Sequence, residues 1–221
     1  MKILILAAMD KELSLLKNLF EGNISSIDDN YFKGTIENKE IIIAKCGIGK
    51  VNAALNCQIL INEFKPDIVL NSGVAGGAAL PIGSLLVADE IAYDDVWCGP
   101  GTPYGKADGY PLYFKPSKKV LKISAEKIPH AAFGLICTGD KFISTPEEIQ
   151  FIKSKFPSVK AVDMESGAIA QTCIFNNIEF GVIRVVSDTP GEGENIEQYK
   201  DFWSKVPEKT FNAITTIIKN L

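Results

Sequence analysis

The chain has 221 residues, of which 46% are hydrophobic, and it carries a formal net charge of −4. This length and apolar content are sufficient for one large hydrophobic core, so we expect a single domain spanning residues 1–221. The acidic balance offers no electrostatic footprint for nucleic acid, and no apolar run approaches membrane-spanning length, so we expect neither a nucleic acid nor a membrane as partner.

The N-terminal part of the chain predicts alternating strands and helices. Lys2–Ala7 is a nearly continuous apolar run, typical of a central strand covered on both faces. Asp10–Phe20 follows with apolar residues at helical spacing, and Glu12 lies in the first turn of that helix. An acid there is favoured by the helix dipole, so Glu12 taken alone indicates no function. Two further strands are predicted at Tyr31–Ile36 and Glu40–Cys46.

A glycine-rich turn, Gly47–Lys50, follows the second of these strands and opens a helix on which Val51, Leu55 and Ile59 share one face. Such a turn at a helix N-terminus can cradle an anion or a nucleotide. The third glycine of the dinucleotide fingerprint and the lysine-serine pattern of a phosphate loop are both absent, however. We therefore expect a tight turn that brings backbone close to some small ligand.

The middle of the chain contains a second glycine-rich segment and a long irregular one. Asp67–Asn71 predicts a buried strand that runs into Ser72–Gly77. The three glycines of that segment would let backbone amides approach a ligand, or would simply form a flexible loop. Ser84–Ile91 predicts another strand. Tyr93–Phe114 is rich in proline, glycine and aromatic residues, and long irregular segments are usually functional or at an interface.

The second half of the chain continues the alternation without a linker. Helices are predicted at Ser117–Ile128, from Thr145 with Pro146 at the first helical position, from Ser166 to about Asn176, and in the tail up to Leu221. Strands are predicted at Ala132–Cys137, Val159–Val162 and Phe180–Val186. The alternation predicts a three-layer α/β/α domain whose central sheet is mixed and mainly parallel.

Three acids, Glu12, Glu165 and Asp188, each follow a buried strand directly. The carboxyl ends of parallel strands meet at one edge of a sheet, so these acids could line one cleft. Ser166, next to Glu165, is expected to cap the following helix through its hydroxyl. Paired carboxylates suit cleavage of a sugar–heteroatom bond, because one can protonate the leaving group while another activates water. Incidental convergence of turn acids is the alternative.

The cationic and metal-binding side chains limit the chemistry further. Arg184 is the only arginine and lies in the apolar run GVIRVV, so we expect it to pair with a carboxylate, Asp163 being the best placed. Arginine is the residue that binds phosphate in a bidentate way, so a phosphate co-substrate is disfavoured, although lysine-based sites stay open. A single histidine argues against a zinc site and against a Ser-His-Asp triad. We expect no metal and no cofactor.

Location is predicted from the N-terminus and the cysteines. The segment MKILILAAM is followed too soon by charged residues to be a signal peptide. The five cysteines are widely scattered without a CxxC pair, which is typical of free thiols in a reducing compartment. We expect a cytoplasmic protein.

Several motifs, in this order, resemble those of the bacterial 5′-methylthioadenosine/S-adenosylhomocysteine nucleosidases, within the nucleoside phosphorylase superfamily. The resemblance runs along nearly the whole chain, and the set is far more specific than any one motif. The motifs are AMDKE (Ala8–Glu12), GIGKV (Gly47–Val51), NSGVAGG (Asn71–Gly77), TGDKFI (Thr138–Ile143), VDME (Val162–Glu165) and VSD (Val186–Asp188).

The resemblance implies a nucleoside phosphorylase-like fold and a role for each matched residue. Glu12 would orient and activate water, and Asp188 would donate a proton to N7 of adenine so that the base leaves in its neutral form. Glu165 would bind the ribose hydroxyls. The other substrate contacts that it implies are Met164 against the sugar, Phe142 stacked on the purine, the backbone of Ile143 at the purine edge, and Ile48 and Tyr199 on the 5′ side.

The sequence departs from the family pattern at two places. Val74 stands where the family usually has serine, which removes one hydroxyl contact near the ribose. Tyr93–Phe114 differs from the aromatic-rich segment with which the family helps to cover the 5′ substituent across a dimer. Both departures leave the preferred 5′ substituent open, and neither touches the matched acids.

The resemblance implies hydrolysis of 5′-modified adenosines to adenine and the 5′-modified ribose, because the phosphate loop of the phosphorylase branch is absent from Ala7–Glu12. It also implies a homodimer, which would cover aromatic side chains of the irregular segment that a monomer would expose: Trp97, Tyr104, Tyr110 and Phe114. Two alternatives stay open. A phosphorolytic enzyme would require phosphate for base release, and a non-catalytic nucleoside-binding module would bind without releasing base.

Overall fold

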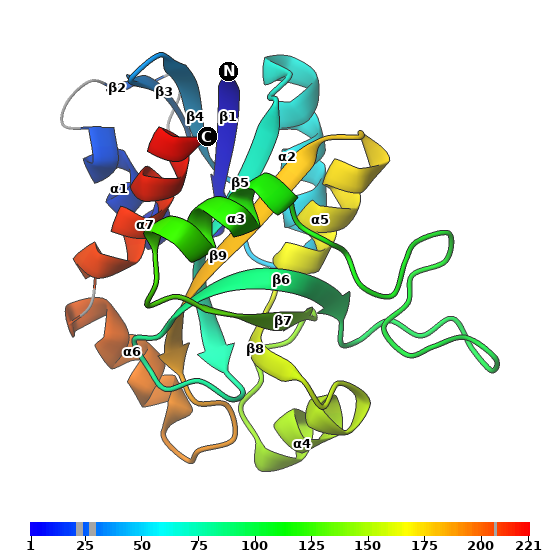
Figure 1. Ribbon diagram of the computed structural model, residues 1–221. Helices are drawn as coiled ribbons and strands as arrows, with labels where there is room; N and C mark the ends of the chain where they lie inside the picture. Colours follow the sequence, from blue (N-terminus) through cyan, green and yellow to red (C-terminus); the bar gives the residue numbers. More distant parts are fainter. Residues whose placement is uncertain (21–23, 27–29, 206) are drawn as a thin grey trace.

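The computed structural model describes residues 1–20, 24–26, 30–205 and 207–221. One sheet runs through these residues with the strand order β2-β3-β4-β1-β5-β8-β7-β6-β9 (Figure 1). The strands are β1 (Lys2–Ala7), β2 (Ile24–Ser26), β3 (Tyr31–Ile36), β4 (Lys39–Lys45), β5 (Ile68–Gly77), β6 (Leu85–Tyr93), β7 (Ala132–Thr138), β8 (Val159–Asp163) and β9 (Glu179–Asp188). The helices are α1 (Asp10–Lys17), the 3₁₀ turn η1 (Asn18–Phe20), α2 (Lys50–Phe64), α3 (Lys118–Lys127), α4 (Pro146–Lys155), α5 (Ser166–Phe175), α6 (Asn195–Lys205) and α7 (Pro207–Asn220).

Helices cover both faces of the sheet, as the buried apolar runs predict. Leu4 and Leu6 of β1 point into a core shared with α2 and α5, whereas Ile3 and Ile5 point into a core shared with α1, α3 and α7. Figure 1 shows α2 and α5 together on one side of the strands and α1 and α7 on the other. Strand β1 pairs in parallel with both β4 and β5. The predicted α/β class with a mixed, mainly parallel sheet is confirmed.

The second half of the sheet closes on itself, which the sequence did not indicate. Strand β5 pairs in parallel with β9 along its length, and at its end Gly76 and Gly77 pair antiparallel with β8. The strands β5, β8, β7, β6 and β9 therefore form a closed ring. The end of β5 thus lies inside a packed ring rather than at an open sheet edge.

The glycine-rich segment Ser72–Gly77 is the end of β5, so the loop interpretation was wrong. A Cβ atom at Gly76 would lie 2.5 Å from Pro190, and one at Gly77 would lie 2.3 Å from the carbonyl oxygen of Leu80. The glycines allow neighbouring chain to approach the strand where it changes from β1 to β8 as partner. Close packing explains the composition of this segment.

Helix α2 carries apolar side chains on more than one face. Val51, Leu55 and Ile59 share a face as predicted, but that face is exposed to 67%, 59% and 52% respectively. The buried residues of α2 are Ala53, Cys57, Leu60 and Ile61. The apolar spacing therefore located one face of the helix without telling which face meets the core.

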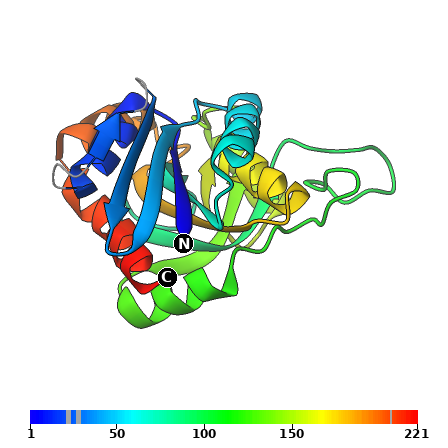
Figure 2. The same ribbon diagram turned by 90° about the horizontal axis from the view of Figure 1, so that it is seen from above.

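The segment between β6 and α3 reaches out from the body past α5 (Figures 1 and 2). Trp97 is exposed there, as expected, but Phe114 is fully buried and bridges back to Ile91. Tyr104 packs edge-on against Phe151 at a ring-centroid distance of 5.5 Å. The expectation that all four aromatic residues would be exposed was therefore wrong. Among the residues that the structure describes, no helix is long and apolar enough to cross a membrane.

Candidate active site

Glu12, Glu165 and Asp188 line one cavity of about 170 Å³, as the strand-end argument predicts. Glu12 lies in the first turn of α1, just beyond β1, while Glu165 follows β8 and Asp188 ends β9. All the other residues singled out as substrate contacts line the same cavity: Ile48, Val74, Phe142, Ile143, Met164 and Tyr199. The sequence-predicted residues are therefore brought together in one place.

Glu12 is held by three backbone donors. Its Oε2 accepts from the N–H groups of Ala8 (2.8 Å) and Met9 (3.1 Å), and its Oε1 accepts from the N–H of Val74 (3.0 Å). Burial raises the pKa of Glu12, while the Arg184 charge and the three N–H donors work against that rise. The carboxyl group is thereby fixed in place, and its raised pKa makes it a better proton acceptor than an exposed glutamate.

Gly73 makes room for that carboxyl group. A Cβ atom at position 73 would lie 2.5 Å from Oε1 of Glu12. The sequence suggested that glycines here let a ligand approach the backbone, but at Gly73 the approaching group is the protein's own acid. Any larger residue would displace Glu12.

Glu165 is tied to the glycine-rich turn before α2. Its Oε1 accepts from the N–H of Gly49 at 2.9 Å, so this turn holds an acid of the cavity with its backbone. Burial, and next the charge of Asp163, raise the pKa of Glu165 to about 8. Gly49 has φ +89°, a conformation that favours glycine, and the N–H of Lys50 beside it donates to Asp140 at 2.6 Å.

Asp188 is buried and accepts two hydrogen bonds. The hydroxyl of Ser187 donates to Oδ1 at 2.7 Å, and the Nδ2 of Asn195 donates to Oδ2 at 3.1 Å. Burial raises the pKa of Asp188, and both donors oppose that rise. A carboxyl group whose pKa is raised by burial holds its proton more firmly than an exposed aspartate, as a general acid must.

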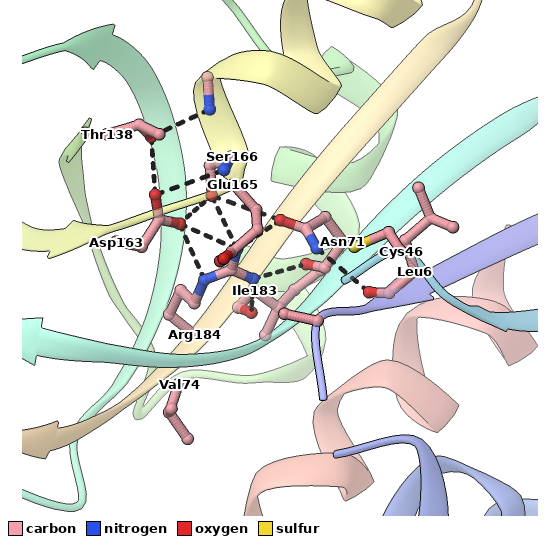
Figure 3. A network of polar contacts seen from close by, with 12 residues as sticks. Leu6, Cys46, Asn71, Val74, Thr138, Asp163, Glu165, Ser166, Ile183 and Arg184 are labelled. Carbon is pink, nitrogen blue, oxygen red and sulfur yellow. Dashed lines mark hydrogen bonds and ion pairs between the residues drawn. The ribbon is translucent and has the colours of Figure 1, made fainter. Parts of the chain in front are cut away.

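Arg184 and Asp163 form the predicted buried ion pair (Figure 3). Arg184 is 2% exposed, and its Nη2 and Nε lie 2.9 Å and 3.0 Å from Oδ2 of Asp163. The guanidinium also donates to the side chain and the carbonyl of Asn71 on β5 and to the hydroxyl of Ser166 on α5. The pair therefore joins β5, β8, β9 and α5 beneath the cavity.

Ser166 does not cap α5 as expected. Its hydroxyl donates to Asp163 and lies in the Arg184 network, so it is not free to accept from the amides of the first turn. Those amides are bound instead by Asp163, which accepts from the N–H of Ser166 at 3.3 Å, and by Thr138, which accepts from the N–H of Gly167 at 2.9 Å. Burial of the arginine charge outweighs the local capping preference.

An aromatic and sulfur-rich wall bounds the other side of the cavity. Phe142 and Tyr199 meet edge to face at a ring-centroid distance of 5.8 Å, and the hydroxyl of Tyr199 lies 3.2 Å from the sulfur of Met9. Phe142 and Ile48 are partly open to solvent. The cavity thus combines flat apolar surface with three acids, which suits a purine attached to a sugar.

Sequence reasoning missed two residues that hold Asp188. Ser187 is adjacent to it, and Asn195 bonds both Asp188 and the carbonyl oxygen of Ile143, the latter at 3.1 Å. An asparagine near a helix start is a common cap, so the available signal at Asn195 concerned only the beginning of α6.

Comparisons with known proteins identify the family. The family model described as "Phosphorylase superfamily" matches residues 2–219. A curated 5′-methylthioadenosine/S-adenosylhomocysteine nucleosidase of Lysinibacillus sphaericus (strain C3-41) is 39% identical over 206 residues, which cover 89% of this chain and 90% of that protein.

The solved structures that are similar over the whole chain include the following two. One is a 5′-methylthioadenosine/S-adenosylhomocysteine nucleosidase from Colwellia psychrerythraea 34H in complex with adenine, with a TM-score of 0.93, 31% identity and coverage of 100% of this chain and 96% of that one. The other is the futalosine hydrolase of Helicobacter pylori strain 26695, with a TM-score of 0.90, 30% identity and coverage of 100% and 98%.

Proposed function

We propose a function from the premise that the chain belongs to the phosphorylase superfamily and, within it, to the family of the 5′-methylthioadenosine/S-adenosylhomocysteine nucleosidases. The protein is an N-glycosyl hydrolase that cleaves 5′-modified adenosines to adenine and the 5′-modified ribose. The observation that carries this conclusion is the meeting of Glu12, Glu165 and Asp188 in one cavity with a purine-sized aromatic wall.

The three acids divide the reaction between them. Glu12 accepts a proton from the attacking water, a task supported by its three N–H donors and its raised pKa. Asp188 gives a proton to N7 of adenine, so that the base leaves without negative charge. Glu165 binds the ribose hydroxyls, and Met164 packs against the sugar ring. Positive charge that develops on the ribose at the transition state is stabilised by the carboxylate of Glu12.

The remaining contacts place the substrate. Phe142 stacks on the purine, and the backbone of Ile143 binds its edge. Ile48 and Tyr199 line the 5′ side, and Val74 contributes an apolar surface near the ribose in place of a hydroxyl. An apolar 5′ pocket discriminates only by about 10–200-fold per methylene-sized change, so methylthioadenosine and adenosylhomocysteine should both be accepted.

Free base released in phosphate-free buffer is the decisive measurement. We expect adenine and a reducing sugar from methylthioadenosine and adenosylhomocysteine. Inosine should react at least ~10⁴-fold more slowly, because a 6-oxo group presents an acceptor where the edge of the site requires a donor. An absolute requirement for phosphate would establish the phosphorolytic alternative, and adenosine binding without base release would establish a binding module.

Futalosine belongs in the same assay, because the H. pylori neighbour carries that name and matches this chain along its length. Its rate relative to that of methylthioadenosine tests whether this chain shares the substrate for which that neighbour is named. A rate on futalosine well above that on methylthioadenosine would change the substrate assigned here while leaving the hydrolytic chemistry intact.

We further infer a homodimer in the cytoplasm, formed by a single domain spanning residues 1–221. The support for the dimer is an exposed apolar patch, which we call the α2 stripe, made of Val51, Leu55 and Ile59 on α2 and Phe175 on α5. The stripe begins three residues after Ile48, which lines the cavity. A second copy packed there through a two-fold axis would cover the open 5′ side of the site. Free cysteines support the reducing compartment.

A further inference from the structure

Asn195 lies behind the cavity rather than in its lining. It is the first residue of α6 and is 3% exposed. Its Nδ2 donates to the carbonyl oxygen of Ile143 and to Oδ2 of Asp188, both at 3.1 Å. One amide group therefore joins the backbone carbonyl and the carboxyl group that together form the purine end of the cavity.

The orientation of this amide is fixed by its surroundings. The nitrogen and oxygen of an asparagine side chain have to be distinguished by their hydrogen-bond partners. The carbonyl oxygen of Ile143 can only accept, so the nitrogen of Asn195 must face it. The same NH₂ group then supplies its second hydrogen to Oδ2 of Asp188, and a reversed amide would place two acceptors against each other.

The two oxygens of Asp188 consequently differ. Oδ2 faces an NH₂ group, which can only donate. Oδ1 faces the hydroxyl of Ser187, and that hydroxyl has a second acceptor, the carbonyl oxygen of Ala75, at 3.3 Å. A proton on Oδ1 leaves Oδ2 as a carbonyl-type acceptor for Asn195, and Ser187 can turn toward Ala75. A proton on Oδ2 would weaken the bond from Asn195, because the NH₂ group can only donate and cannot turn to accept that proton.

We propose that Asn195 is a positioning residue that keeps Oδ2 of Asp188 as the accepting oxygen and fixes the spacing between Asp188 and the Ile143 carbonyl, so that the proton given to the base comes from Oδ1. This inference rests on the proposed nucleosidase function. In the transfer the Oδ1–H bond breaks, N7 of the base gains the proton, and the electron pair stays on Asp188. Asn195 and Ser187 then stabilise the resulting carboxylate by donating to it.

This arrangement has a measurable effect on the pH dependence of the reaction. Removal of the Asn195 donor raises the pKa of Asp188, because the bond stabilises its charged form. The limb of kcat/KM that reports the loss of the Asp188 proton should therefore move to higher pH. Wild type and a variant at position 195 share all the other titratable groups that line the cavity, which are Glu12, Lys141, Asp163, Glu165 and Tyr199. A difference between their pH profiles therefore reports on position 195.

The experiment compares Asn195→Ala and Asn195→Asp with wild type, using methylthioadenosine and measuring adenine. Aspartate matches asparagine in size but offers at most one hydrogen to the two acceptors, so it separates lost donors from lost packing. Glu197→Ala, an exposed change on the same helix, is the control. We expect kcat to fall by about 10–100-fold in both variants at position 195. The high-pH limb should rise by roughly half to one unit in Asn195→Ala, and the control should match wild type.

Circular dichroism establishes that each variant is folded, and the isosteric Asn195→Asp supplies the rate measurement if Asn195→Ala does not fold. Unchanged kcat in either variant would overturn the proposal. So would a reduced kcat in Asn195→Ala with an unmoved limb, since that result would mean a merely structural role. Failure of the wild type to release adenine would instead overturn the proposed function itself.

Discussion

At the scale of single residues, the three acids of the cavity share burial but differ in what holds them. Glu12 is bound by backbone N–H groups and Asp188 by side chains, while Glu165 accepts from the turn before α2. Backbone donors stay in place when a side chain is replaced by its amide. We therefore expect the acids to be exchangeable for amides with little effect on folding.

Glu12→Gln and Asp188→Asn should each lower the rate of adenine release by ~10²–10⁴-fold, the usual effect of removing a positioned base or acid. Both variants should fold, and Glu12→Gln should melt slightly below wild type, because its NH₂ group would face one of the N–H donors that bind the carboxylate. Steady-state kinetics and differential scanning calorimetry measure the two effects. A near-normal rate in either variant removes that residue from the mechanism.

Gly73→Ala tests the base without altering its chemistry. The new Cβ atom would lie 2.5 Å from Oε1 of Glu12, so the carboxyl group must shift. A misplacement of this size costs on the order of 10²-fold in rate. Gly193→Ala is the matched control, because a Cβ atom there has no heavy atom within 4 Å. Equal activity of the two alanine variants would contradict the assigned position of the base.

The sequence predicted the acids of this site better than it predicted their supports. Glu12, Glu165 and Asp188 each follow a strand that its apolar run makes recognisable, and strand ends converge in such folds. Asn195 contacts Ile143 across 52 positions of chain, and that contact depends on how α6 packs. No local sequence pattern encodes this contact. A side chain whose position depends on tertiary packing therefore cannot be predicted from the sequence around it.

At the scale of secondary structure elements, the ion pair between Arg184 of β9 and Asp163 of β8 joins four of them. Arg184→Met should destabilise the fold by about 3–5 kcal/mol, because Asp163 would stay buried without its partner. Urea unfolding measures this difference. Lys122→Met, which removes an exposed partner of Glu126, is the control and should change stability by about 0–1 kcal/mol. A loss below 1 kcal/mol for Arg184→Met would show that the pair is dispensable.

The elements themselves show where local patterns fail. The strand β1 was predicted to the residue, because a buried parallel strand is apolar throughout. The end of β5 was missed, because glycines that permit close packing look like glycines that form loops. The buried face of α2 was missed as well, because apolar residues lie on more than one face of this helix and their spacing does not tell which face meets the core.

At the scale of the whole molecule, the buried acids make stability depend on pH. The pKa of Glu165 is raised from 4.5 to about 8 and that of Asp94 from 3.8 to about 7, both first by burial. At a pH between the unfolded and the folded pKa of such a group, the folded chain keeps a proton that the unfolded chain releases. The free energy of unfolding therefore falls as pH rises through this range. Glu12 and Asp188 act in the same direction. Exposed Glu148, with its pKa lowered to about 2, acts in the opposite sense only at lower pH.

We therefore expect the melting temperature of the ligand-free protein to fall by several degrees between pH 6 and pH 8, at roughly 2–4 °C per kcal/mol for a chain of this size. Glu165→Gln should flatten the slope. Scanning calorimetry at constant ionic strength measures both. A melting temperature that rises over this window, or an unchanged slope in the glutamine variant, would contradict the assignment.

The α2 stripe predicts the state of association. Leu55→Glu should convert the dimer to a monomer at micromolar concentration, because a charge at the centre of an apolar interface is left desolvated and unpaired. Ile82→Glu, at an exposed apolar residue outside the stripe, should leave the dimer intact. Sedimentation velocity distinguishes the two. A wild-type chain that sediments as a monomer with full activity would disprove the dimer.

Closure of the ring by β9 also bears on the order in which the strands pair during folding. In the ring, Ile68 of β5 pairs with Glu179 of β9, so this contact joins distant parts of the chain and should form slowly. Until β9 has been synthesised, the nascent chain has unpaired edges on β5 and β6, and such edges are prone to aggregate. Asp188 is the last residue of β9. The pairing that covers these edges is therefore also the one that places Asp188, to which we assign protonation of the leaving group.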